Sequence, residues 1–198
     1  MSFRDHIPKR RTITSEVKDY TDHRKDLQLD FSKRCGYCND IHTWRFASYE
    51  IDHFIPRKRN KKPFLTIKTE TDYSNLVYSC KSCNNSKSNK WPTNDENISH
   101  KNNEGFIDPC DDDYKEQFTR LPNGQIRPST VLGEWIYKEL KLHKPQHEFI
   151  WNIEQLDMLI EETTALLHAD TENNDIKTTL LTFYQSYRAY TKQLGNDD

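Results

Sequence analysis

The chain has 198 residues, of which 30% are charged and only 33% are hydrophobic, and its mean hydropathy is −1.02. This length suits one domain with small additions, the low apolar content excludes a large hydrophobic core, and the 12% of aromatic residues argues against a disordered chain. No apolar run approaches the roughly 18 residues of a membrane span and the start of the chain lacks the apolar stretch of a signal peptide, so we expect a soluble cytoplasmic protein without membrane contact.

Basic and acidic residues are unevenly distributed along the chain. Residues 1–100 hold 19 Lys/Arg and 13 Asp/Glu, whereas residues 101–198 hold 10 and 18. The basic residues are most concentrated in the run Pro56–Lys62. A basic half joined to an acidic half predicts that one half contacts a polyanion. A solvated charged loop explains the run Pro56–Lys62 alone about as well.

Apolar spacing predicts a supporting helix over residues 14–34, with Ser15 as its N-cap. β-forming residues in alternation predict a strand within residues 45–56 that ends near His53. A second short strand is expected over Leu76–Tyr78. The two strands and the helix would form a small mixed unit in the first half of the chain.

The middle of the chain is polar and rich in turn residues. A short helix is expected from Asn84, although its composition is weak for a helix. Residues 93–105 are interpreted as a loop, and the turn signals at residues 108–109 and 123–124 predict one hairpin before Pro128.

The remaining sequence has the apolar periodicity of helices. One helix is expected from Ser129, and two longer helices carry apolar positions over residues 149–166 and 176–187. The polar link 168–175 joins these two helices, which favours an antiparallel pair. The apolar stripes are interpreted as the protein's own core, with a partner-docking surface as the alternative.

The five cysteines include two CxxC pairs, Cys35/Cys38 and Cys80/Cys83, and leave Cys110 over. In a reducing cytoplasm disulfides are improbable, whereas two CxxC turns can present four thiolates to one tetrahedral Zn²⁺. We therefore expect a closed, structural zinc site. The spacing between the pairs exceeds that of a zinc ribbon, so a further unit must be inserted between them.

Several short motifs accompany the two CxxC pairs. Asp52-His53-Phe-Ile-Pro56 and Asn75 lie between the pairs, and Asn84 and Lys87 follow the second pair. In this order and spacing, residues 33–90 resemble the HNH endonucleases, specifically the subgroup stapled by two CxxC knuckles. The resemblance implies an α+β fold: a small ββα-metal core with a four-Cys zinc site, an N-terminal helix and a mostly helical C-terminal region.

The resemblance also implies roles for the motif residues. His53 would be the general base that activates water, and Asp52 and Asn84 would hold the catalytic cation. The side chain or the backbone of Asn75 would orient the imidazole and fix its tautomer. The residue chemistry agrees, because a neutral His with a pKa of about 6.5 can accept a proton at physiological pH. A carboxylate with an amide oxygen favours Mg²⁺ or Mn²⁺. The expected nucleic-acid contacts are Lys87, Arg57 and Lys58.

Each of these residues also has a structural explanation on its own. Asp52 and His53 could be a hydrogen-bonded pair, Asn75 and Asn84 helix caps, and Lys87 a solvated side chain. Together they favour a metal-dependent endonuclease acting on DNA over a zinc-stabilised nucleic-acid-binding module without catalysis. Cys110 is expected to be a thiol outside the zinc site, and no role is assigned to His6, His23, His42, His100, His143, His147 and His168.

A weaker resemblance concerns the second half of the chain. The turn residues of 105–128 and the helices after them are similar to the tail of small bacterial HNH proteins of antiphage loci, such as the Septu HNH subunit. This implies an antiviral defence nuclease that works with a separate ATPase subunit. The expected division of the chain is an N-terminal arm and helix (1–34), an HNH core with zinc knuckles (35–92), a loop and turn region (93–128) and a helical region (129–198).

Overall fold

The structure is a computed structural model that describes residues 1–13, 16–44 and 48–196. Helices make up 45% and strands 14% of the chain, which confirms the α+β class. The elements in chain order are η1 (Tyr20–His23), α1 (Arg24–Asp30), η2 (His42–Trp44), β1 (Tyr49–His53), β2 (Lys58–Arg59), β3 (Lys62–Pro63), η3 (Tyr73–Asn75), β4 (Leu76–Cys80), α2 (Lys81–Lys87), β5 (His100–Lys101), β6 (Glu104–Gly105), α3 (Asp112–Glu116), β7 (Phe118–Arg120), β8 (Ile126–Pro128), α4 (Val131–Glu139), α5 (Pro145–Ala169) and α6 (Asn174–Asn196).

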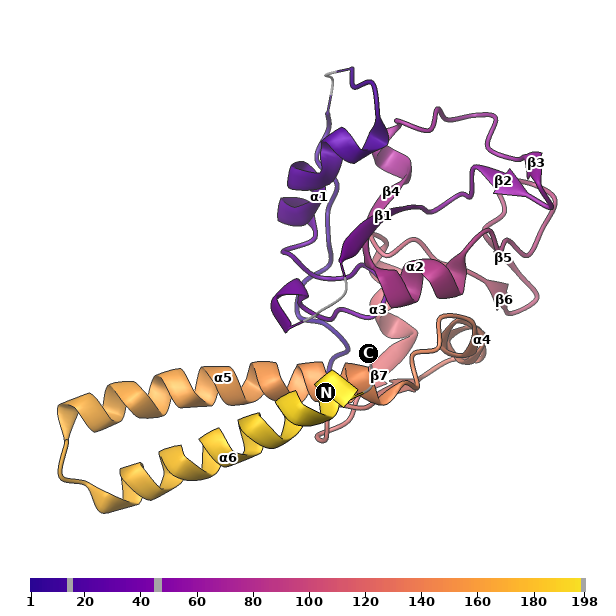
Figure 1. Cartoon of the computed structure of the whole chain (residues 1–198). Coiled ribbons are helices and arrows are strands. Elements are labelled where there is room, and N and C mark those ends of the chain that lie inside the picture. The colour runs from indigo at the N-terminus through magenta and orange to yellow at the C-terminus, as the bar shows by residue number, and fades with distance from the viewer. Residues whose placement is uncertain (14–15, 45–47, 197–198) are drawn as a thin grey trace.

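The centre of the fold is the antiparallel pair β1–β4, followed by α2 (Figure 1). Strand β1 ends at His53, as the sequence predicts, and His53 lies opposite Leu76. Strand β4 runs to Cys80, two residues beyond the expected end, and α2 begins at Lys81 rather than at Asn84. Cys80 is the N-cap of α2, because its sulfur accepts the backbone N–H of Cys83 at 3.5 Å. The second CxxC pair therefore forms the turn from strand to helix.

The supporting helix is much shorter than the sequence predicts. It comprises η1 and α1, and it is capped by Asp19, whose side chain accepts the N–H of Thr21 at 2.8 Å. It ends before Ser32 and Lys33, whose left-handed backbones have φ values of 51° and 58°. The expected cap at Ser15 lies outside the described residues.

Three small hairpins surround this centre. The expected hairpin is present as β7–β8, whereas β2–β3, β5–β6 and the helix α3 are additions to the predicted elements. The turn of β2–β3 is formed by Asn60 and Lys61, and the turn of β5–β6 by Asn102 and Asn103, all with positive φ. Such two-residue turns match the twist of paired strands, and Asn tolerates their left-handed backbone. The stretch 93–105, expected to be a loop, thus closes into a hairpin at its end.

The predicted antiparallel helix pair is present as α5 and α6, which project away from the rest of the molecule (Figure 1). Helix α5 begins with Pro145, which fits a first helical position because its missing N–H has no partner there. Within the described residues, no helix is long and apolar enough to span a membrane.

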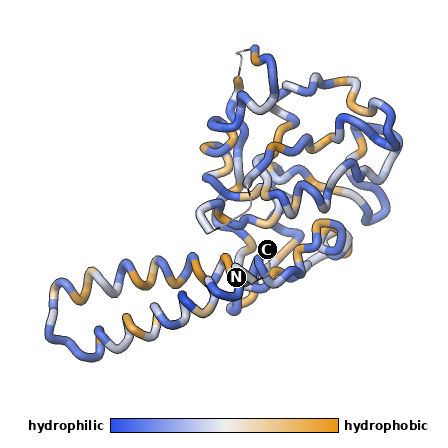
Figure 2. Tube along the Cα trace, viewed as in Figure 1, coloured by the Kyte–Doolittle hydropathy of each residue, from blue (hydrophilic) through white to orange (hydrophobic). Residues whose placement is uncertain are grey.

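The main hydrophobic core joins segments from both halves of the chain, from Phe3 to Leu142. A second cluster of Ile150, Ile153 and Leu194 lies at the base of the α5–α6 pair. Hydrophobic positions continue along both helices beyond it (Figure 2), and Leu181 and Tyr184 are 58% and 50% exposed. On α5 and α6 the apolar stripes therefore form a cluster at the base of the pair, and Ile160 is also buried farther along α5.

Candidate active site

The four cysteines of the two CxxC pairs are buried and lie together. Their sulfur atoms are all within 4.8 Å of one another, and those of Cys38 and Cys80 are 3.8 Å apart. With Zn–S bonds of about 2.3 Å, a tetrahedral four-thiolate site requires sulfur separations of roughly 3.8 Å. The expected zinc site is confirmed as a four-Cys cluster that fits this ion.

Cys110 lies outside the four-Cys cluster, as the sequence predicts. Burial raises the pKa of Cys110 to about 12, so its thiol stays protonated.

The first knuckle is packed closely against the strand pair. The N–H of Gly36 donates to the carbonyl of Tyr78 at 2.8 Å, and a Cβ at Gly36 would lie 2.7 Å from Val77. Two buried guanidinium groups hold the same turn, since Arg4 donates to the carbonyl of Gly36 and Arg120 to that of Cys38. The zinc site and the β1–β4 pair therefore form one rigid unit.

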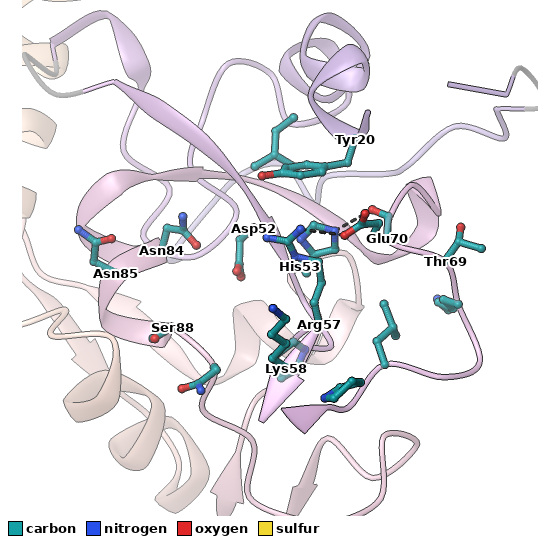
Figure 3. Close-up of a pocket in the computed structure, with 16 residues that line it drawn as sticks. Tyr20, Asp52, His53, Arg57, Lys58, Thr69, Glu70, Asn84, Asn85 and Ser88 are labelled. Atoms are coloured by element: carbon teal, nitrogen blue, oxygen red, sulfur yellow. Dashed lines mark hydrogen bonds and ion pairs between the residues drawn. The ribbon is translucent and has the colours of Figure 1, made fainter. Parts of the chain in front are cut away.

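A pocket of about 910 Å³ lies beside the C-terminal end of β1. Figure 3 shows that Asp52 and His53 from β1 and Asn84 from α2 point toward one open space. Tyr20 from η1 and Glu70 from the connection before η3 close other sides of this space. The structure thus brings together three of the four expected catalytic residues in one pocket.

The imidazole of His53 is held by a backbone group. Its Nε2 lies 2.7 Å from the carbonyl oxygen of Glu70. Because a carbonyl oxygen only accepts hydrogen bonds, the neutral ring carries its proton on Nε2 and its lone pair on Nδ1. The ring also contacts Tyr20 edge to face, with centroids 4.8 Å apart. Tautomer and ring orientation are therefore both fixed.

The surroundings of His53 favour its neutral form. Burial lowers the pKa of His53, and the positive charges of Arg57 and Lys87 act in the same direction. The Glu70 carbonyl and the charge of Asp52 act in the opposite direction without reversing the shift. At physiological pH the imidazole is therefore available to accept a proton.

The carboxylate of Asp52 is held at one oxygen. Its Oδ2 accepts the hydroxyl of Tyr37 at 2.5 Å and lies 2.9 Å from Nζ of Lys87. Both contacts fall on Oδ2, so Oδ1 is the carboxylate oxygen left for a cation in the pocket. Tyr37 lies between the two cysteines of the first knuckle and joins the zinc site to this carboxylate.

Lys87 differs from the expectation of a nucleic-acid contact. Its side chain is 0% exposed, and its ammonium group donates to the carbonyl of His53 at 2.8 Å in addition to pairing with Asp52. An ammonium group buried in this way cannot reach a phosphate. Lys87 is the last residue of α2, and its contacts are with Asp52 and His53 of β1 instead of with solvent.

Asn75 contacts the backbone that follows His53. Its side-chain oxygen accepts the backbone N–H of Ile55 at 2.9 Å, and its side-chain N–H donates to the carbonyl of Ile55 at 3.1 Å. The backbone carbonyl of Asn75 accepts the N–H of Phe54 at 2.8 Å. It therefore holds the chain where it leaves β1, while the carbonyl of Glu70 holds the imidazole directly. Asn75 acts on His53 only through the backbone that follows it.

Asn84 donates its side-chain N–H to Glu50 at 2.6 Å, which leaves the amide oxygen unused by that bond. Figure 3 shows Asn84 beside Asp52, with this oxygen on the side of Asp52. A carboxylate oxygen and an amide oxygen are suitable ligands for a hard divalent cation. The geometry is compatible with the expected ligand pair.

Arg57 and Lys58 also line the pocket, and both are exposed. Arg57 forms an ion pair with the carboxylate of Glu70 at 2.8 Å and lies over the ring of Tyr20. Both cations are accessible to a phosphate, in contrast to Lys87.

Sequence reasoning missed three residues of this site: Tyr20, Tyr37 and Glu70. Tyr37 could have been found from the sequence, because a tyrosine between the two cysteines of a knuckle lies close to the zinc site. Glu70 acts through its carbonyl, which every residue has, so its side chain gave no signal.

Several of the unassigned histidines have structural contacts. His147 of α5 pairs with Asp40 at 2.7 Å, His42 with the hydroxyl of Tyr78 at 3.0 Å, His23 with the carbonyl of Thr71 at 3.2 Å and His100 with the hydroxyl of Ser99 at 3.1 Å.

Comparison with known proteins agrees with the geometry. Residues 35–90 match the family model of the HNH endonucleases. The matched region begins at the first zinc cysteine and includes β1, β4 and α2. This part of the chain is an HNH endonuclease domain. None of the curated proteins or solved structures that were compared with the chain matches it.

Proposed function

We propose that the protein is a metal-dependent endonuclease that hydrolyses phosphodiester bonds of DNA. The observation that carries this proposal is the hydrogen bond from Nε2 of His53 to the Glu70 carbonyl, because it leaves a basic Nδ1 in a pocket that also holds Asp52. The match of residues 35–90 to HNH endonucleases supports the same chemistry.

In the proposed reaction, His53 accepts a proton from water at Nδ1, and the resulting nucleophile attacks the phosphorus. Oδ1 of Asp52 and the amide oxygen of Asn84 would hold Mg²⁺ or Mn²⁺. The cation would stabilise negative charge on the phosphate and on the 3′ oxygen as the bond from phosphorus to that oxygen breaks and the oxygen takes a proton from water. Arg57 and Lys58 bind neighbouring phosphates. The family resemblance implies 5′-phosphate and 3′-hydroxyl ends.

The test is cleavage of plasmid DNA with Mg²⁺ or Mn²⁺ by the wild type and by His53→Ala. We expect His53→Ala to lose roughly 10²-fold or more of the rate, the usual contribution of general-base catalysis. His100→Ala is the matched control, since His100 is an exposed residue on β5 and does not line the pocket. Equal nicking by wild type and His53→Ala would refute the assignment of the base.

The alternative function is a zinc-stabilised nucleic-acid-binding module without catalysis. It accounts for the zinc site and the basic residues, but it gives no reason for a fixed His tautomer beside a carboxylate. DNA binding without cleavage at any divalent cation concentration would favour this alternative.

We further propose a cytoplasmic antiviral defence role with a separate ATPase subunit, in the manner of Septu systems. This proposal rests on the resemblance of residues 105–128 and the following helices alone. Its test is co-purification of an ATPase encoded next to this protein, with Leu181→Asp or Tyr184→Asp in the exposed part of α6 and Lys177→Asp as control.

A further inference from the structure

The β2–β3 hairpin, here called the basic hairpin (residues 57–63), stands at the edge of the catalytic pocket. Its two strands pair Lys58 with Pro63 and Arg59 with Lys62, and Asn60 and Lys61 form its turn with φ values of 51° and 65°. Lys58 and Pro63 line the pocket. Figure 1 shows the hairpin on the outer side of the domain, remote from the α5–α6 pair. A tight turn therefore presents a basic tip next to the proposed reaction site.

The basic hairpin is anchored beside its turn, through Arg59, and just after its second strand. The guanidinium of Arg59 donates to the carbonyl of Thr93 and to the side chain of Asn94, and it lies 5.8 Å from the ring of Phe64. Just after the hairpin, the carboxylate of Glu96 accepts the N–H of Thr66 at 2.8 Å. These contacts tie the hairpin to residues 93–96. Because the hairpin is already held in place, binding of a ligand to it costs less conformational entropy.

The charges of the hairpin divide into two groups. Arg57 and Arg59 are engaged by Glu70 and by residues 93–94. Lys58, Lys61 and Lys62 are exposed and form no ion pair with any residue that the structure describes. Residues 57–63 contain no acidic residue, so the like charges repel one another. A polyanion bound at the tip would relieve this repulsion.

From this arrangement we propose that the basic hairpin is a sequence-independent clamp for the phosphate backbone of duplex DNA, a proposal that rests on the endonuclease function above. Lysine ammonium groups are point charges that suit phosphates, whereas base-specific contacts are made best by planar, bidentate groups. Proteins that bind single strands stack bases on several aromatic side chains. Tyr20 is the one aromatic residue that lines the pocket among the described residues, and residues 57–63 contain none.

The clamp predicts a change in the salt dependence of binding. In a His53→Ala background, which prevents cleavage, the affinity for a labelled duplex is measured by fluorescence anisotropy from about 50 to 200 mM salt. Lys61→Ala/Lys62→Ala should make the negative slope of log K against log[salt] shallower by about 1.8, because each lost phosphate contact contributes about 0.9 to its magnitude. Lys58 is left intact because it lines the pocket.

The matched control is Lys177→Ala/Lys192→Ala, which removes the same charge from exposed positions on α6. This control should leave the slope unchanged, and both double variants should retain zinc. Equal slopes for the two double variants would overturn the clamp. A slope change on single-stranded DNA but not on the duplex would overturn the choice of duplex.

The clamp and the endonuclease function fail in different ways. If the protein cleaves DNA through His53 but Lys61→Ala/Lys62→Ala leaves the salt dependence of binding unchanged, the clamp alone is rejected. Hairpin-dependent binding by a protein that never cleaves would reject the endonuclease function and leave the clamp supported.

Discussion

Nζ of Lys87 lies 2.9 Å from Oδ2 of Asp52, and neither side chain is more than 8% exposed. This buried ion pair lies directly beneath the end of β1. It engages Oδ2 of the carboxylate and leaves Oδ1 for a cation. The lysine is thus part of the structure that supports the site.

Lys87→Met should destabilise the protein by about 3–5 kcal/mol, because removing one partner of a buried pair leaves the other charge uncompensated. Denaturant unfolding followed by circular dichroism measures this change. Lys90→Met is the control, since the pair of Lys90 with Glu139 is partly exposed and should contribute at most about 1 kcal/mol. Adding Asp52→Asn to Lys87→Met should cost less than the two single effects combined; full additivity would argue against the pair.

Tyr37→Phe removes the hydroxyl that donates to Oδ2 of Asp52 while keeping the shape of the buried ring. A hydrogen bond to a charged group contributes about 1.5–3 kcal/mol, so the carboxylate, held then by Lys87 alone, should be less firmly oriented. We expect cleavage to require a higher Mn²⁺ concentration for half-maximal rate, with zinc content unchanged. Tyr114→Phe is the control, because its hydroxyl donates at 2.9 Å to the carbonyl of Tyr37 and does not touch Asp52. An identical Mn²⁺ dependence in all three proteins would contradict this role.

The pH dependence of cleavage should follow His53. A general base acts in its neutral form, so the rate should rise with pH through the pKa of His53 and then level off. Because burial lowers this pKa, the rise should occur below the ordinary value of about 6.5. A bound cation acts in the same direction, since it disfavours the positive imidazolium. Measurement of kcat/KM from about pH 5 to pH 8 tests this expectation; a midpoint above 7 would contradict it.

Removal of zinc should unfold the HNH domain. Binding of structural zinc contributes on the order of 10 kcal/mol in zinc-finger peptides, and the domain's β1–β4 pair is packed directly on the knuckles. Metal analysis should find about one zinc per chain in the wild type, and Cys83→Ser should lose zinc and circular-dichroism signal together. Cys110→Ser should keep both. Well-folded wild-type protein without zinc would refute the zinc assignment.

The sequence by itself determined the frame of the site. The spacing of the two CxxC pairs is enough to predict the zinc site, because each short turn can place two sulfur atoms on one ion. The pattern around His53 predicts where β1 ends, and the periodicity after residue 129 predicts the helices. These features depend on neighbours in the chain. The four-part division of the chain stays a prediction.

Only the tertiary structure decided which atoms act on the site. The burial of Lys87, the carbonyl of Glu70 at His53 and the hydroxyl of Tyr37 at Asp52 all join residues distant in sequence. Their pairing depends on how β1, β4 and α2 pack, and backbone carbonyls carry no side-chain signal. Likewise, left-handed residues shorten the helix before Cys35 and close the basic hairpin, since a single backbone conformation can override periodicity and composition. Spacing along the chain therefore predicted the motif, whereas burial and long-range packing decided the role of each residue in it.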